Sequence, residues 1–186
     1  MHTARSLELS QAAVWETAHV VEEAHAVVLA HYDRENLPLR RYLVFLGMDP
    51  DSARETVQET FLKLHEHLLA DGDRTNLRAW LYRVAHNLAR NAQSAFHASK
   101  TDLLADVTLA GEFASGSQSA EDELLAKERL MLLHQAIGQL SAVQRECLVL
   151  RAQGLKYREI AEVMNLSVST VAENVQRGLG RLKEML

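Results

Sequence analysis

Nearly the whole chain has the pattern of amphipathic helices, and this restricts the fold more than any other feature. Apolar residues recur at intervals of three and four, which places them on one face of a helix. Only two of the 186 residues are proline, and 47% are hydrophobic, which suffices for a core. Ala, Leu, Glu, Gln and Arg, all good helix formers, recur throughout. We therefore predict an all-α protein.

One segment, residues 101–120, lacks this helical pattern. Gly111 and Gly116 stand there among small polar residues, a composition typical of a flexible tether. The sequence therefore predicts two small helical domains joined by a flexible linker. We expect an N-terminal helical extension over residues 1–25, a first domain over 26–98, the linker over 99–120 and a second domain over 121–186.

The first segment is expected to form several consecutive helices. One is predicted over residues 7–29 and another over 38–47, because proline suits a first turn and glycine a helix end. A further helix, capped by Asp51 or Ser52, should run to about residue 69. After a loop over 70–76, a last helix should run from 77 to about 96. Two apolar stripes are expected to be buried, comprising Val57, Phe61, Leu64 and Leu68 and then Trp80, Leu81, Val84, Ala85 and Leu88.

The second domain has clear signals for helix starts and ends. After a helix over residues 121–139, Ser141 and Gln144 match a capping box, in which each side chain satisfies a backbone donor of the other residue. Gly154 suits the left-handed conformation at a helix end. A short helix over 157–164 should then be followed by a turn and by a last helix capped at Ser167.

Residues 157–177 predict a helix-turn-helix motif. Ala161 supplies a small residue where two helices cross, Asn165 tolerates the left-handed turn, and Val171 locks the second helix. Such a motif presents its second helix to the DNA major groove. The alternative is a purely structural helical corner. The expected core residues are Ile160, Met164, Leu166 and Val175, and the outward ones are Ser169, Thr170, Ala172, Glu173, Gln176 and Arg177.

With these motifs, the chain resembles the extracytoplasmic-function (ECF) sigma factors of bacterial RNA polymerase. Residues 140–171 are similar to region 4 of that family, which reads the −35 promoter element. Residues 52–64 resemble the region 2 helix that docks on the polymerase β′ clamp. Residues 76–91 resemble the helix that reads and melts the −10 element. Both domains and the linker match the family in order and spacing, over about residues 26–186.

The resemblance implies a site for each partner. The physical pattern agrees for the −10 helix. Four of its polar residues share one helix face and could hold a phosphate and an unstacked base together, namely Arg83, Asn87, Arg90 and Asn91. Tyr82 and Trp80 could stack on bases, although Trp80 lies on the apolar stripe and is expected in the core, whereas His86 is expected at the surface. The implied residues are Glu55, Gln58, Glu59 and Lys63 for polymerase, Arg83, Asn87, Arg90 and Asn91 for the −10 element, and Ser169, Thr170, Glu173, Asn174, Gln176 and Arg177 for the −35 element.

The recognition helix departs from the family pattern. Ala172, Glu173 and Asn174 stand where basic residues are usual, and Gly178 and Gly180 interrupt a helix that is usually continuous. The formal net charge of the chain is −5. Because phosphate contacts supply much of the affinity for DNA, these departures predict weakened contact or an atypical promoter.

The resemblance implies RNA polymerase core, through its β′ clamp and β subunit, promoter DNA and an anti-sigma factor as partners. A cytoplasmic protein is expected, because no apolar run approaches the roughly 20 residues that cross a bilayer. Two other functions fit parts of the pattern. A stand-alone helix-turn-helix regulator would bind DNA without polymerase, and a sigma mimic would bind an anti-sigma factor without DNA.

We expect neither enzymatic activity nor a cofactor, because no convergent set of polar residues suggests an active site. The histidines do not indicate a metal site. His19, His25 and His31 are spaced by six residues and His65 and His67 by two, and neither spacing places two ligands on one helical face.

Overall fold

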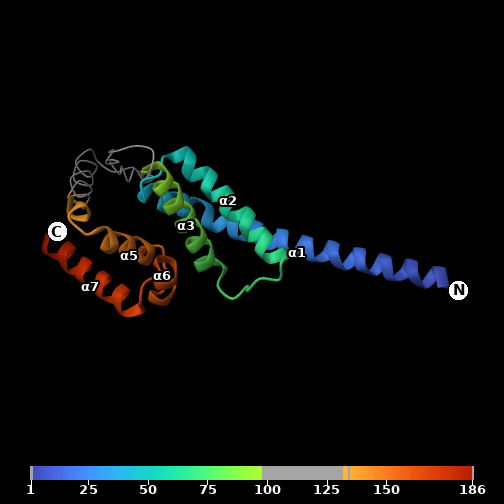
Figure 1. The fold of residues 1–186 in the computed structure, drawn as a ribbon. Helices are drawn as coiled ribbons and strands as arrows, with labels where there is room; N and C mark the ends of the chain where they lie inside the picture. The colour runs from blue at the N-terminus through green and yellow to red at the C-terminus, as the bar shows by residue number, and fades with distance from the viewer. Residues whose placement is uncertain (1, 98–131, 134, 186) are drawn as a thin grey trace, which may run out of the picture. The chain divides into compact units, whose positions relative to one another are not determined.

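The computed structural model describes residues 2–97, 132, 133 and 135–185 of the chain, and all regular secondary structure among them is helical. The chain divides into two compact units, one built on α1 to α3 and the other on α5 to α7 (Figure 1). The predicted all-α, two-domain class is therefore confirmed. The expected linker over 99–120 and most of the expected helix over 121–139 lie outside the described residues. The helices are α1 His2–Phe45, α2 Pro50–Leu69, α3 Leu77–His97, α5 Ala142–Ala152, α6 Tyr157–Met164 and α7 Val168–Met185.

The prediction of two separate helices before residue 47 is wrong, because α1 runs without a break through Pro38. A proline inside a helix removes one hydrogen bond and costs about 3 kcal/mol. The buried positions nevertheless continue in phase on both sides of it, at Glu35, Leu39 and Tyr42. Packing of this continuous stripe against α2 and α3 offsets the cost of the proline. The same helix includes residues 2–25, the predicted extension.

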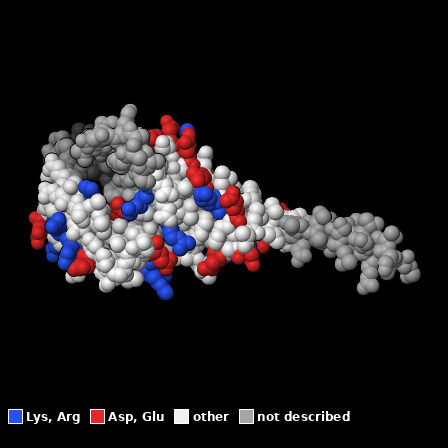
Figure 2. Space-filling view, in the orientation of Figure 1, with Lys and Arg blue, Asp and Glu red and all other residues white. Residues whose placement is uncertain are grey.

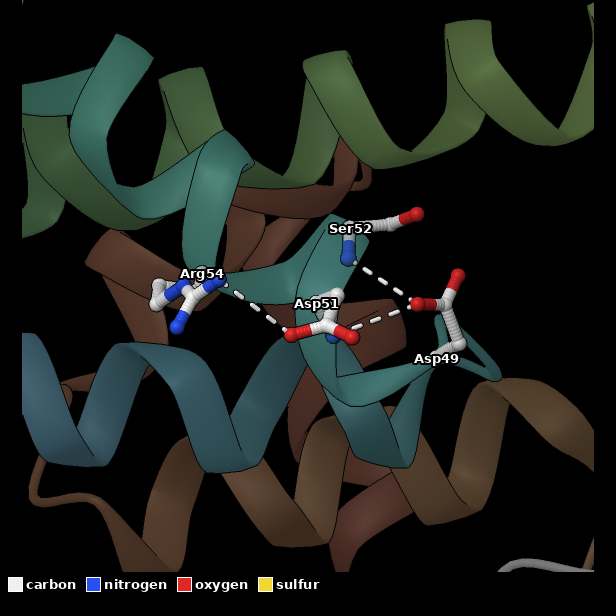
Figure 3. A network of polar contacts seen from close by, with 4 residues as sticks. All are labelled: Asp49, Asp51, Ser52 and Arg54. Carbon is white, nitrogen blue, oxygen red and sulfur yellow. Dashed lines mark hydrogen bonds and ion pairs between the residues drawn. The ribbon is translucent and has the colours of Figure 1, made fainter.

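The cap of α2 is Asp49 rather than the predicted Asp51 or Ser52. Its Oδ1 accepts the backbone N–H groups of Asp51 at 3.1 Å and Ser52 at 3.0 Å (Figure 3). Pro50 takes the first helical position, where a missing N–H costs nothing. Hydrogen bonding with the Ser52 side chain, and then with the backbone of Ser52 and Asp51, lowers the pKa of the Asp49 carboxyl. The expected buried stripe is confirmed, with Val57, Phe61, Leu64 and Leu68 each at most 5% exposed.

Both α1 and α2 pack against α3, so the buried arc of α3 is wider than a single apolar stripe. Leu81 and Ala85 are fully buried as predicted, whereas Trp80 is half-buried with its ring stacked on His67 at 4.8 Å between centroids. On the side toward α1, the rings of Tyr42 and Tyr82 lie 5.5 Å apart. The burial of this second side brings polar residues into the core, and Val84 and Leu88 are left half-buried.

In the second unit the predicted caps are confirmed. Ser141 and Gln144 form the capping box of α5, with Ser141 Oγ accepting the Gln144 N–H at 3.2 Å. Gly154 follows the helix with φ of 89°, a left-handed value that glycine adopts without strain. The helix α7 is continuous through both of its glycines. Gly178 is buried where α7 packs on α5, and a Cβ there would meet Leu148 Cδ1 at 2.8 Å.

Candidate nucleic-acid and polymerase interfaces

The helix-turn-helix geometry predicted from the sequence is present in α6 and α7. Ala161 is 6% exposed at the crossing, and Val171 and Val175 are buried on the inner face of α7. Asn165 ends α6 in the left-handed conformation, with φ of 53°. This turn allows the chain to change direction over the three residues 165–167 before α7 begins. The second helix is therefore held firmly by its apolar face, and its other face remains exposed.

The hydroxyl of Ser167 caps the start of α7. Its Oγ accepts the Thr170 N–H at 3.1 Å and lies 2.7 Å from the Thr170 hydroxyl. At the start of α6, the Lys156 N–H donates to Glu159 Oε2 at 2.7 Å. Each cap satisfies a backbone donor that would otherwise lack a partner at the helix end. The Ser167 bonds fix the first turn of α7, which is the part of a recognition helix that meets base edges.

The predicted −35 residues differ in how they are presented on α7. Ser169, Glu173 and Gln176 are exposed opposite the buried face. Arg177 is exposed as well, but its guanidinium is ion-paired with Glu173 one turn earlier. The Asn174 amide donates to the Thr170 carbonyl oxygen at 2.8 Å and is half-buried. Asn174 is therefore occupied by its own helix, and Glu173 offsets the positive charge of Arg177.

The four predicted −10 residues lie together on the solvent face of α3. Arg83, Asn87, Arg90 and Asn91 are all exposed. They lie opposite the arc that packs on α1 and α2. The helix contains three arginines and neither Asp nor Glu, although the whole chain carries a net charge of −5 and basic and acidic side chains are interspersed on the face shown in Figure 2. Among the described residues, neither Arg83 nor Arg90 forms an ion pair. This face can therefore attract the phosphates of a nucleic acid strand.

The expectation that His86 lies at the surface is wrong, because its side chain is 2% exposed. The Nδ1 atom forms a 2.8 Å hydrogen bond with the Tyr42 hydroxyl. Burial, and then the charge of Arg90, lowers the pKa of His86 to about 4. A neutral imidazole is thus built into the contact between α1 and α3, beneath the predicted −10 face. The apolar pattern could not show this, since it is contact with α1 that buries this side of α3.

Tyr82 is fully buried, so the expectation that it could stack on a base is also wrong. Its ring lies beneath the Arg78 guanidinium, at 5.8 Å from the centroid. Arg78 is ion-paired through Nε with Oε1 of the buried Glu35, at 2.8 Å. Burial, and then the charge of Glu35, raises the pKa of the Tyr82 hydroxyl. These side chains join α1 to the first turns of α3, which positions the helix.

The predicted polymerase-contact residues lie on the solvent face of α2. Glu55, Gln58 and Glu59 are exposed, and Lys63 is half-buried and ion-paired with Glu59 at 3.5 Å. Sequence reasoning missed Leu62, which is 65% exposed at the centre of this face. In the sequence, Leu62 stands off the apolar stripe of α2, and this signal could have identified it as an exposed leucine. Leu62 therefore adds an exposed apolar side chain to a face that is otherwise polar.

Within the described part of the chain, no group of three His, Cys, Asp or Glu side chains could hold a metal ion. His65 and His67, the two histidines nearest to each other in sequence, do not face a common site. His67 Nε2 is hydrogen-bonded to the Asp73 carbonyl oxygen at 3.0 Å, and His65 is half-buried. None of the described helices is long and apolar enough to span a membrane.

Two sequence profiles match the chain, each over one unit. The Sigma-70 region 2 profile matches residues 32–95, and the Sigma-70, region 4 profile matches residues 130–182. The first match contains the exposed faces of α2 and α3, and the second contains the helix-turn-helix. The two units are thus those of a sigma-70-type transcription factor.

Relatives matched over most of their length agree with this class. The chain is 30% identical over 158 residues to RNA polymerase sigma factor SigZ of Bacillus subtilis, covering 83% of this chain and 84% of the relative. It is 35% identical over 138 residues to RNA polymerase sigma-H factor of Pseudomonas aeruginosa, covering 69% and 70%. Solved structures share the fold. CnrH bound to the cytosolic domain of CnrY aligns with a TM-score of 0.59, 22% identity and 91% and 93% coverage.

A second solved structure, the sigma factor RpoE with the anti-sigma factor NepR from Bartonella quintana, aligns with a TM-score of 0.60. It is 24% identical and covers 84% of this chain and 94% of that one. ECF RNA polymerase sigma factor SigL of Mycobacterium tuberculosis is 29% identical over 165 residues, covering 85% of this chain and 88% of the relative. With these relatives, the chain belongs to the RNA polymerase sigma factors of the ECF type. Its function is promoter recognition in transcription initiation.

Proposed function

We propose that the exposed faces of α2, α3 and α7 divide the work of this sigma factor. The face of α2 carrying Glu55, Gln58, Glu59 and Lys63 docks on core polymerase, with Leu62 as its apolar centre. The first domain is assigned to residues 26–98, the linker to 99–120 and the DNA-reading second domain to 121–186. The observation that carries the proposal is the acid-free, exposed polar face of α3.

The face of α3 binds the −10 element during strand opening. Arg83 and Arg90 bind phosphates, and Asn87 and Asn91 carry amides that can both donate to and accept from a base edge. The rigid contact with α1 behind this face keeps the four side chains in place. Because a sigma factor acts within the polymerase holoenzyme, this face needs only part of the total affinity for DNA.

The face of α7 reads the −35 element. Ser169, Thr170, Glu173, Asn174, Gln176 and Arg177 are its predicted residues. Ser169 and Gln176 are exposed and can pair with base edges. The intrahelical bonds of Arg177 and Asn174 leave fewer charged contacts to phosphate, so we expect weak binding of DNA by the isolated protein.

We further propose that the protein acts in the cytoplasm as a regulator without enzymatic activity or cofactor. We also propose that an anti-sigma factor controls it. The support for this partner is that both aligned solved structures hold a second protein: CnrH is bound to the cytosolic domain of CnrY, and the sigma factor RpoE is bound to the anti-sigma factor NepR. An occluding partner would cover the faces of α2 or α7 that polymerase and DNA need.

Three substitutions test the division of work in reconstituted holoenzyme. Gln58→Ala should weaken binding to core polymerase, whereas Arg83→Ala should leave that binding intact and slow opening of the −10 region. Gln176→Ala should change the base preference at one position of the −35 element. It should leave unchanged the transcription from a template whose strands are already separated, because such a template does not depend on the −35 sequence. If all three variants lose the same step, the division of work is wrong.

A second candidate function, a sigma mimic that binds an anti-sigma factor without DNA, is favoured by one observation. The Glu173 carboxylate pairs with Arg177, which leaves the recognition helix with little net positive charge. Holoenzyme formed with a mimic would not open any promoter fragment. Holoenzyme formed with a promoter-specific sigma factor would open some fragments and not others.

A further inference from the structure

A pair of arginines on α1 has no role in the sites above. Arg34 and Arg41 are exposed and seven residues apart, so they lie on one face of the helix. Glu23 lies on the same face, three turns before Arg34. Glu23 is ion-paired at 2.7 Å with Arg74, in the loop that leads to α3. The face of α1 that carries Arg34 and Arg41 therefore borders the α3 side of the first unit.

The two helices α1 and α3 run alongside each other in the same direction. Glu35 contacts Arg78 near the start of α3, and Tyr42, two turns later in α1, contacts both Tyr82 and His86. Arg41 therefore lies level with residues 82–86 of α3.

Successive residues of an α-helix are rotated by about 100° about its axis. The residues just before and just after a buried residue therefore lie on opposite flanks of the helix, and this fixes the flank from which these arginines project. On α3, Leu81 precedes Tyr82 and is buried on the α2 side, whereas Arg83 follows Tyr82 and is exposed on the opposite side. On α1, Tyr32 turns toward α2, where its ring meets that of Phe61 at 5.0 Å. Arg34 and Arg41 lie on the other side of Glu35. Both pairs of arginines thus project away from α2.

The result is one surface, the composite arginine face, made of Arg34 and Arg41 from α1 and Arg83 and Arg90 from α3. Among the described residues, none of these four side chains forms an ion pair. No Asp or Glu stands three or four residues from Arg34 or Arg41, and α3 has none at all. Four uncompensated guanidinium groups on one face of an acidic chain favour a polyanionic ligand.

We propose that Arg34 and Arg41 bind backbone phosphates of promoter DNA, next to the nucleotides held by α3. This inference rests on the proposed role of α3 and extends the nucleic-acid surface onto a second helix. Arginine suits the task because its planar guanidinium can donate two parallel hydrogen bonds to one phosphate. Since these contacts are made to phosphate, they add affinity and registration without base preference.

The test is the salt dependence of promoter binding by reconstituted holoenzyme. Each lost phosphate contact lowers the slope of log K against log salt by roughly 0.7 to 0.9. The double variant R34A/R41A should therefore reduce the slope by about 1.5 and weaken binding at low salt roughly tenfold, whichever promoter sequence is used. The matched control is Arg40→Ala, which removes an exposed arginine from the side of α1 that faces away from α3. It should leave the slope unchanged.

The variant R34K/R41K, which keeps the charges, should retain most of the slope. Arg83→Ala serves as a second reference, because it reports on α3 alone. If Arg83→Ala lowers the slope and R34A/R41A does not, the inference about α1 is wrong and the role of α3 stands. If neither lowers it, the role of α3 fails too. A loss of core binding by R34A/R41A with an unchanged slope would also overturn the inference, since the face would then contact polymerase.

Discussion

The buried histidine between α1 and α3 makes the first unit sensitive to mild acid. The pKa of His86 is about 4 in the folded protein, against 6.5 for an unperturbed histidine. Between these pH values the unfolded chain binds a proton and the folded chain does not. Stability therefore rises with pH through this window, and it falls as the pH drops from 7 towards 4.

The size of the effect follows from the two pKa values. Each pKa unit corresponds to about 1.4 kcal/mol. Going from pH 7 to pH 5 protonates nearly all of the unfolded histidine and little of the folded one, which costs about 1 to 2 kcal/mol of unfolding free energy. With a urea m-value of about 1.5 kcal/mol/M, the unfolding midpoint should fall by roughly 1 M.

Urea titrations at pH 7 and pH 5 measure this directly. Both tryptophans of the chain, at positions 15 and 80, belong to the first unit, so their fluorescence follows that unit alone. The variant His86→Gln, which cannot titrate, provides the comparison and cancels the contribution of the other ionisable groups. The wild-type midpoint should fall by more than that of the variant. Equal falls in the two proteins would show that His86 titrates normally, and the burial argument would be refuted.

Other predictions concern single contacts. Gly180→Ala should raise the unfolding free energy by about 1 kcal/mol, because a Cβ there meets open space in a helix. Gly178→Ala should gain less than Gly180→Ala, because its Cβ would press on Leu148 and offset the gain in helix propensity; equal gains in thermal melts would disprove the close packing. Ser141→Ala should cost about 1 kcal/mol through loss of the capping box, with an unchanged melting temperature as the contrary result. Leu62→Ala should weaken core binding about tenfold without altering stability.

The local signals in the sequence predicted the second unit well. The capping pair Ser141 and Gln144, the left-handed positions at Gly154 and Asn165, and the buried Val171 all depend on interactions within a few residues. Such interactions can be read from residue types and spacing alone. The exposed positions on α7 follow from the same helical period.

Predictions failed where contacts between distant segments decide the structure. Proline usually begins or ends a helix, but burial of Glu35 and Leu39 on its two sides keeps α1 continuous through Pro38. His86 and Tyr82 lie off the apolar stripe of α3, and only the presence of α1 explains why they are buried. A single-stripe reading of a helix cannot find a second buried side when that side includes polar residues.

The polar face of the recognition helix α7 has more internal contacts than its residue types alone predict. The sequence pointed to Glu173 as an unusual residue on a recognition helix. The structure pairs it with Arg177 and turns Asn174 onto the backbone of its own helix. Two of the side chains predicted to contact DNA, Arg177 and Asn174, are therefore already engaged within the recognition helix. The proposed division of work therefore requires that DNA affinity come mainly from α3, from the arginines beside it and from polymerase.

Run-off transcription tests the central claim most directly. Core RNA polymerase, the purified chain and a library of promoter fragments from the same genome would be combined, and transcript starts would be mapped. We predict discrete starts that appear only when the chain is present and that disappear for Arg83→Ala on duplex templates. Starts identical to those of core polymerase alone would contradict the claim that this chain directs promoter recognition.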